Sequence, residues 1–268
     1  MMRNFLFIGI VIVFSYSCTS KKIAYKREVE EEVFANSDTV VDAVKLLSKN
    51  LDKFKIYPDS IFYLRSNFYM DCSENPNLLV AGRLIGDEKF YGIDYSCKDS
   101  LLVFYRLDDE TWKVIGREEE YDFHTIEFED LDGDKRNEIL TSTFPNMNGN
   151  SFKDVFYCSK KSDTIKYAGG FSSNYKVNLF KRRIEVEYYG SWYAPQSKTI
   201  YEWRDEKIIP VKEVILSLKK ADMIHDAQFI SYYENPTRDK DTLVLKFKKT
   251  YREKNKKLYN LWENFFDQ

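Results

Sequence analysis

The hydrophobic run Leu101–Leu107 (LLVFYRL), the polar segment Asp108–Glu110 and the run Trp112–Ile115 (WKVI) determine the local structure in the middle of the chain. β-branched and aromatic residues favour strands, whereas Asp is typical of turns. These segments therefore predict a β-hairpin. Two further strand-like runs follow, Thr125–Phe128 and Ile139–Thr143. We interpret the four runs as the strands of one blade-like unit.

The same alternation of short hydrophobic runs and polar turns continues from residue 60 to residue 250. The 268-residue chain contains 20 Tyr and 20 Phe, and aromatic residues are enriched in strands. Turn signals at short, regular spacing are typical of antiparallel sandwiches and propeller-like sheets, so we expect a mainly β fold. The other expected strands are Ile61–Leu64, Leu78–Leu84, Phe90–Tyr95, Val155–Cys158, Tyr175–Leu179, Ile184–Tyr189, Thr199–Trp203, Ile208–Leu216, Gln228–Tyr233 and Thr242–Tyr251.

Helices are expected on both sides of this β domain, which we place at residues 57–251. Residues 37–56 predict an amphipathic helix, because apolar residues recur at helical spacing from Val40 to Phe54 and lysines lie on the other side. Residues 252–268 predict a C-terminal helix whose stripe runs from Leu258 to Phe265. Both stripes are typical of surfaces that pack on a core.

The N-terminus has the pattern of a secretory signal. Arg3 precedes the apolar run Phe5–Phe14, which is too short to span a membrane, and small residues precede Cys18. The segment around Cys18 resembles a bacterial lipobox, which implies that residues 1–17 are removed and that Cys18 is lipid-modified. Residues 18–36 then provide the lipidated cysteine and a polar tether. We expect a lipid-anchored protein of the bacterial cell envelope, on the periplasmic face of the outer membrane.

Charge and cysteine content narrow the function classes further. The 41 basic and 43 acidic side chains nearly balance, and this argues against nucleic acid as a partner. In an oxidising envelope, Cys72 and Cys97 are the expected disulfide pair, with unpaired buried thiols as the alternative. The absence of a CxxC motif argues against a zinc site.

The segment Asp130–Glu138 (DLDGDKRNE) is the strongest chemical motif. Ca²⁺ takes six to eight oxygen ligands, and acids at alternate positions of a tight loop supply them. We therefore predict a structural Ca²⁺ site, and its expected ligands are Asp130, Asp132, Asp134, the Arg136 carbonyl and Glu138. The alternative is an ordinary acidic turn, because Asp and Gly are common in turns.

This motif resembles the calcium loops of FG-GAP and VCBS-type β repeats. A wider resemblance, from Thr125 to Val211, is to a family of bacterial periplasmic immunity proteins typified by a Xanthomonas lipoprotein and related in fold to inhibitors of i-type lysozyme. Its motifs are the acidic loop, Val155–Tyr157, Gly169–Asn174, Arg183–Val186, Tyr189–Trp192 and Tyr201–Ile208. The resemblance implies binding and inhibition of a cell-wall hydrolase, with calcium supporting the fold.

The expected function follows from these features. We predict a non-enzymatic envelope lipoprotein that binds a protein partner such as a peptidoglycan hydrolase. Trp192 and Tyr193 are the candidate contact residues because aromatics are enriched at interfaces, and the alternative is an aromatic turn that packs in the core. No nucleophile elbow, phosphate loop or HExxH motif occurs, so we expect no enzyme activity. The alternatives are a structural or glycan-binding envelope module and, less favoured, a degenerate hydrolase.

Overall fold

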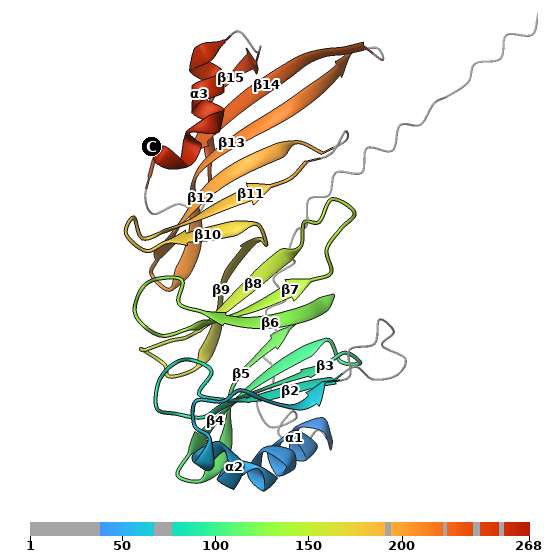
Figure 1. The fold of residues 1–268 in the computed structure, drawn as a ribbon, viewed down its shortest axis with the longest axis vertical. Coiled ribbons are helices and arrows are strands. Elements are labelled where there is room, and N and C mark those ends of the chain that lie inside the picture. The colour runs from blue at the N-terminus through green and yellow to red at the C-terminus, as the bar shows by residue number, and fades with distance from the viewer. Residues whose placement is uncertain (1–37, 67–76, 191–193, 222–223, 238–241, 252–254) are drawn as a thin grey trace, which may run out of the picture. The chain divides into compact units, whose positions relative to one another are not determined.

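The computed structural model describes residues 38–66, 77–190, 194–221, 224–237, 242–251 and 255–268. In this part of the chain, helices precede and follow a long series of strands (Figure 1). All of these elements belong to one compact unit, Ser37–Gln268. The predicted fold class, mainly antiparallel β with helices on both sides, is confirmed.

The described strands form three sheets, and in each sheet every strand pairs with its neighbours in sequence in the antiparallel sense. The first sheet contains β1 (Phe62–Ser66), β2 (Asn77–Gly82), β3 (Tyr91–Ser96), β4 (Leu101–Asp108) and β5 (Thr111–Glu119). The second contains β6 (Phe123–Glu129), β7 (Glu138–Thr143), β8 (Phe152–Cys158) and β9 (Ile165–Ser172). The third contains β10 (Tyr175–Asn178), β11 (Arg183–Tyr188), β12 (Gln196–Arg204), β13 (Lys207–Ala221), β14 (Ile224–Glu234) and β15 (Val244–Tyr251).

The predicted blade-like unit is wrong, because its four strands are divided between two sheets. β4 and β5 close the first sheet, whereas β6 and β7 open the second. The chain crosses between the sheets after Glu119, and Ile115 and Phe123 both belong to the core between them. Local patterning predicts the strands, but packing elsewhere decides which strands pair.

The first sheet is buried on both faces. Because successive side chains of a strand point to opposite faces, neighbouring residues of its strands pack against different layers. Leu78 and Val80 face the second sheet, where the ring centroids of Phe104 and Phe156 lie 5.4 Å apart. The intervening residues of β2, Leu79 and Ala81, face the helices instead. Sheet-on-sheet packing of this kind forms the interior of a β sandwich.

The second and third sheets repeat this arrangement. Leu140 and Val155 of the second sheet pack against Ile184 and Val186 of the third. The far face of the third sheet buries Val214 and Ile230, together with residues of the C-terminal helical segment. The layers therefore follow the chain: helices, three sheets, and helix again.

The two helical segments differ in detail from the prediction. The helix expected at residues 37–56 is two helices, α1 (Asp38–Lys49) and α2 (Leu51–Ile56). They are separated at Asn50, whose side-chain amide donates to the Leu46 carbonyl at 2.9 Å. Asn competes in this way with the backbone hydrogen bonds of a helix.

The C-terminal segment comprises α3 (Lys256–Glu263) and the short 3₁₀ helix η2 (Phe265–Asp267). Leu258 and Phe265 are buried in the core formed with the third sheet. The predicted packing of this segment on the β domain therefore agrees with the described residues.

One described strand, β9, was not predicted. Its sequence contains Gly169 and Gly170, and glycine is depleted in strands because it lacks a side chain to pack. The structure explains why glycine is present: a Cβ on Gly170 would lie 2.5 Å from the Phe152 ring and 2.7 Å from the Lys153 carbonyl oxygen. Because close packing requires glycine at this position, the segment has fewer of the β-branched and aromatic residues from which a strand is predicted.

Antiparallel pairing places successive turns at opposite ends of the sheets. At one end, which we call the acidic-loop end, the β6–β7, β8–β9 and β12–β13 turns meet through the ion pair Lys160–Asp134 and the hydrogen bond from Ser159 to Glu206. At the other, which we call the uncharged end, the β7–β8 loop meets the turn after β11 through Asn150 and Tyr189. Figure 1 shows the β6–β7 and β7–β8 connections on opposite sides.

Candidate metal centre

The acidic loop connects β6 to β7, and the pair Glu129–Glu138 closes the ladder beneath it. The chain reverses within the loop because Gly133 has φ of 79°, a conformation that glycine adopts without steric penalty. The Asp130 carboxylate accepts hydrogen bonds from the backbone N–H of Gly133 at 2.7 Å and of Lys135 at 3.0 Å. Sequence spacing therefore correctly indicated a tight turn that gathers carboxylates.

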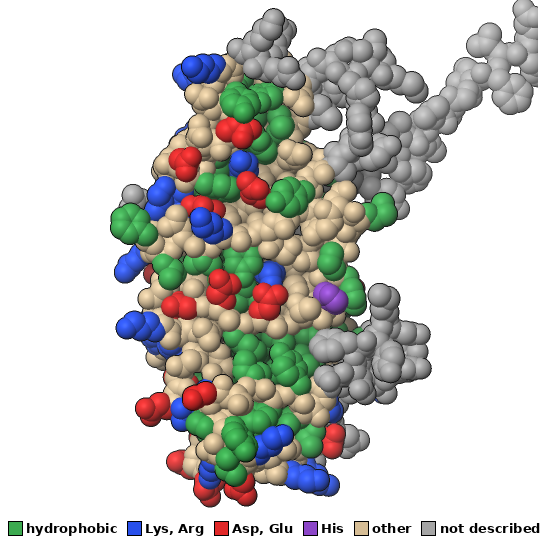
Figure 2. Space-filling view, in the orientation of Figure 1, with side chains coloured by type: hydrophobic (Ala, Val, Ile, Leu, Met, Phe, Trp, Pro, Cys, Tyr) green, Lys and Arg blue, Asp and Glu red, His purple; other side chains and the backbone are tan. Residues whose placement is uncertain are grey.

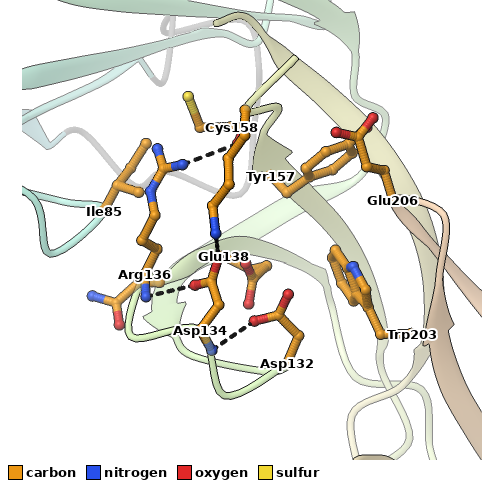
Figure 3. A pocket seen from close by; sticks show the side chains of 11 residues that line it. Ile85, Asp132, Asp134, Arg136, Glu138, Tyr157, Cys158, Trp203 and Glu206 are labelled. Carbon is orange, nitrogen blue, oxygen red and sulfur yellow. Dashed lines mark hydrogen bonds and ion pairs between the residues drawn. The ribbon is translucent and has the colours of Figure 1, made fainter. Parts of the chain in front are cut away.

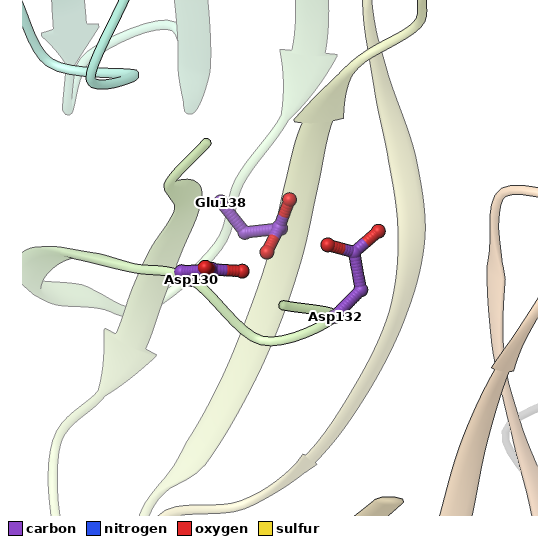
Figure 4. Close-up of side chains that lie close together, drawn as sticks. All are labelled: Asp130, Asp132 and Glu138. Atoms are coloured by element: carbon purple, nitrogen blue, oxygen red, sulfur yellow. The ribbon is translucent and has the colours of Figure 1, made fainter. Parts of the chain in front are cut away.

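Three of the predicted ligands converge. One carboxylate oxygen each from Asp130, Asp132 and Glu138 lies within 4.8 Å of the other two (Figure 4). Glu138 is only 4% exposed, and one of its oxygens accepts from the Leu131 N–H at 2.8 Å. Three carboxylates provide part of the oxygen shell that Ca²⁺ requires, and carbonyls or water complete such shells in proteins.

Burial of this acidic group has an electrostatic consequence. Desolvation raises the pKa of Glu138 to about 8, while the Leu131 N–H opposes the shift and the charges of Asp132, Asp134 and Asp130 add to it. Burial also raises the pKa of Asp132, and the neighbouring carboxylates Asp134 and Asp130 contribute further. The cluster therefore resists full ionisation, and a bound cation would relieve the repulsion between its carboxylates.

Asp134 is engaged elsewhere. One of its oxygens lies 2.6 Å from the Lys160 ammonium, and the other accepts from the Arg136 N–H at 2.8 Å (Figure 3). Its carboxylate is not among the three that converge. A turn on a different hairpin thus supplies a positive charge to the loop.

Arg136 contributes its side chain to the surroundings of the site. Its guanidinium lies 3.6 Å from the Asp87 carboxylate and donates to the Cys158 carbonyl at 3.5 Å. These contacts connect the loop to the first sheet's β2–β3 segment and to the end of β8. Its backbone carbonyl as a ligand stays a prediction.

The loop lies where the three sheets meet. Asn137 holds it to the first sheet, because its N–H donates to the Ile85 carbonyl at 2.8 Å and its side-chain amide donates to the Leu84 carbonyl at 3.2 Å. On the other side, Leu179 of the third sheet lies against Gly133. The acidic loop is therefore a junction of the layers.

A small pocket borders the loop. Its volume is about 100 Å³, and its walls include Asp132, Glu138, Trp203 and Glu206 (Figure 3). The Tyr157 and Trp203 rings meet edge to face, with centroids 5.8 Å apart. Typical small-molecule sites measure roughly 300–1,000 Å³, so this volume suits an ion with its waters better than a sugar.

Several predicted residues lie outside the described part of the chain: Cys18 with the signal and tether, Cys72, Trp192 and Tyr193. Cys97 is disulfide-bonded to a partner that also lies outside it, so the Cys72–Cys97 pairing stays a prediction. Cys158 is a free, buried cysteine, and burial raises the pKa of its thiol.

Sequence reasoning missed the residues that connect the loop to other hairpins, chiefly Lys160, Asn137 and Asp87. Lys160 and Asp134 are separated by two strands, and no local spacing indicates their contact. Asn137 was visible inside the motif, but its role depends on the β2–β3 segment. Long-range contacts of this type require the sheet order.

Comparison with known proteins adds no identification, since neither a protein-family model nor a curated protein sequence matches the chain. Among the described residues, no helix has both the length and the apolar character needed to cross a membrane.

Proposed function

We propose that this protein is a lipid-anchored, non-enzymatic protein of the bacterial cell envelope that binds a protein partner and contains a structural Ca²⁺ site in residues 130–138. The observation that supports the metal site is the convergence of the Asp130, Asp132 and Glu138 carboxylates, of which Glu138 is buried. The most specific form of the partner-binding proposal is that the protein inhibits a peptidoglycan hydrolase.

The position of the loop supports a structural role for the ion. Its backbone and side chains reach the first sheet through Asn137 and the third sheet through Gly133. A cation bound by three carboxylates would hold the turn that joins these layers. Affinity in the range typical of extracellular modules, on the order of 10⁻⁴ to 10⁻³ M, is expected.

The partner-binding role is supported by the sequence resemblance over Thr125–Val211. The motifs of this region occupy β8, β11 and the β12–β13 hairpin, on neighbouring layers beside the acidic loop. The lipid anchor is supported by the signal-like N-terminus and Cys18. Together they favour a binding protein held at a membrane.

The metal site is tested by thermal unfolding of the whole chain in 10 mM Ca²⁺ and in chelator. A ligand at many times its Kd stabilises the folded state by about 1–3 kcal/mol, so the melting temperature should rise with calcium. Asp132→Asn should abolish this rise. Asp59→Asn, at an exposed carboxylate in the turn between α2 and β1, is the matched control and should keep it.

An unchanged melting temperature in calcium, together with wild-type behaviour of Asp132→Asn, would contradict the metal site. The partner-binding role has its own assay: lysis of peptidoglycan by a purified i-type lysozyme or muramidase, with and without the protein. Dose-dependent inhibition of lysis is expected. Full lysis at a large molar excess of the protein would contradict the proposal that it inhibits such an enzyme.

A further inference from the structure

The β7–β8 loop, at the uncharged end of the sheets, differs in composition from the rest of the molecule. No Asp, Glu, Lys or Arg occurs between Glu138 and Lys153, although such residues make up 31% of the chain. This stretch contains the β7–β8 loop, in which Phe144 is 46% exposed and Met147 is fully exposed. Exposed apolar side chains without charged neighbours are typical of contact surfaces.

The loop is fixed to the next layer by a buried amide. Asn150 is 4% exposed, its carbonyl oxygen accepts from the Tyr189 N–H at 3.0 Å, and its amide donates to the Tyr189 carbonyl at 2.6 Å. Tyr189 is itself half exposed. Hydrophobic side chains lie on the surface at this end in Figure 2. The β7–β8 loop and Tyr189 therefore lie on one surface with exposed aromatic and apolar side chains.

The chain enters the folded unit at the same end. In the first sheet, Arg65 lies between Asp42 of α1, at 3.5 Å, and Asp94 near the end of β3, at 2.9 Å. The contact of Arg65 places the first half of α1 over the end of β3 that precedes the β3–β4 turn.

Ring contacts continue this end into the second sheet. Tyr95, next to Asp94, stacks on Phe123 with ring centroids 4.4 Å apart. His124 follows, and its ring lies 4.3 Å from that of Phe144. The start of α1, the start of β6 and the β7–β8 loop therefore share one end, and Figure 1 agrees.

We propose that the uncharged end rests on the lipid surface to which the chain is anchored, with Phe144 and Met147 entering the headgroup region. The proposal rests on the lipid anchor at Cys18 in the proposed function. In the sequence, residues 19–37 separate Cys18 from the start of α1 at Asp38. The proposal therefore takes the end that carries the start of α1 as the end nearer the bilayer.

The chemistry of this end favours a lipid surface. Apolar side chains gain free energy on entering the interface, and the absence of charge from the loop removes the penalty of desolvating ions there. Glu119 and Asp122, at the neighbouring β5–β6 connection, repel anionic headgroups. The surface therefore suits zwitterionic lipids such as phosphatidylethanolamine.

The orientation is tested with the lipid-modified mature chain on phosphatidylethanolamine vesicles that contain a lipid-borne quencher. Met147→Cys carries a fluorescent label at the uncharged end. Phe180→Cys, in the β10–β11 turn of the acidic-loop end, is the matched control because Phe180 is 98% exposed. Interfacial residues enter the bilayer by about 5–10 Å, so a label at position 147 would lie among the lipid headgroups whereas a label at position 180 would remain in water. We therefore expect at least about fivefold stronger quenching at position 147 than at position 180.

Equal, weak quenching at both positions on vesicle-bound protein would overturn the orientation and leave the anchor intact. Failure of the chain to sediment with vesicles would overturn the anchor, and the orientation with it. A label at position 147 that is unquenched on vesicles but becomes shielded when purified hydrolase is added would assign this end to a protein partner instead. Phe144→Asp should lower quenching at position 147 without loss of sedimentation.

Discussion

The two ends of the sheets handle polar groups in opposite ways. At the acidic-loop end, carboxylates gather around a buried Glu138, and Lys160 reaches them from another hairpin. At the uncharged end, the neutral amide of Asn150 joins two connections through three hydrogen bonds to Tyr189 and Asn174. Both connections hold neighbouring layers together, but the carboxylate cluster depends on salt, metal ions and protonation, whereas the neutral amide of Asn150 does not change its charge with pH.

The largest effect is expected from breaking the neutral network. Asn150→Ala leaves the Tyr189 N–H and carbonyl without these partners, and lost buried hydrogen bonds of this type lower the free energy of unfolding by about 3 kcal/mol in total. Chemical denaturation measures it. Asn148→Ala, at an exposed position of the same loop, is the control and should change stability by less than about 0.5 kcal/mol. Equal effects of the two substitutions would refute the role of Asn150.

An effect of similar size is expected from Asp94, a buried carboxyl group away from the acidic loop, and it sharpens the comparison by adding a pH dependence. Burial raises the pKa of Asp94 from 3.8 to about 6, although Arg65 opposes the shift. A raised pKa in the folded state means that the stabilisation is complete below pH 3.8 and is lost as the pH rises through 6. Stability should therefore fall by up to about 3 kcal/mol across this range.

Urea denaturation of the wild type and Asp94→Asn between pH 4 and pH 7 measures this dependence. Asp94→Asn should flatten the curve, whereas Asn150→Ala should shift it downward without changing its slope. A curve for Asp94→Asn that parallels the wild type would show that other groups control the pH dependence.

The smallest effect is expected at the acidic-loop end. Lys160 is 65% exposed, and exposed ion pairs contribute about 0–1 kcal/mol, so Lys160→Met should destabilise the protein only slightly in chelator. The difference should vanish in 1 M NaCl, where the screening length is about 3 Å. The Asn150→Ala effect should not change with salt. A salt-dependent Asn150→Ala effect would mean that the two ends do not differ as described.

The sequence predicted local features well and long-range ones poorly. Hydrophobic runs predicted fourteen of the fifteen strands in the described part of the chain, because alternation is a local property. β9 was missed because Gly169 and Gly170 are required for packing against Ile208 and Phe152. The blade-like unit failed because the step from β5 to β6 has the same local appearance as a hairpin. Only the partners of each strand distinguish the two.

The same division holds for the candidate site. The spacing of Asp130, Asp132 and Glu138 predicted their convergence, since all three lie in one turn. The engagement of Asp134 by Lys160 was not predictable, because these residues meet only after β7 and β8 have paired. The contact of Asn137 with Leu84 likewise depends on the first sheet.

Strand pairing only between neighbours in sequence has a consequence for how the molecule is made. Each sheet is complete as soon as its own segment of chain is available, and none waits for a strand from the far end. Contacts between segments that are near in sequence form faster than contacts between distant segments. During synthesis from the N-terminus, the sheets can therefore form one after another. Each new sheet then packs on the exposed apolar face of the sheet before it.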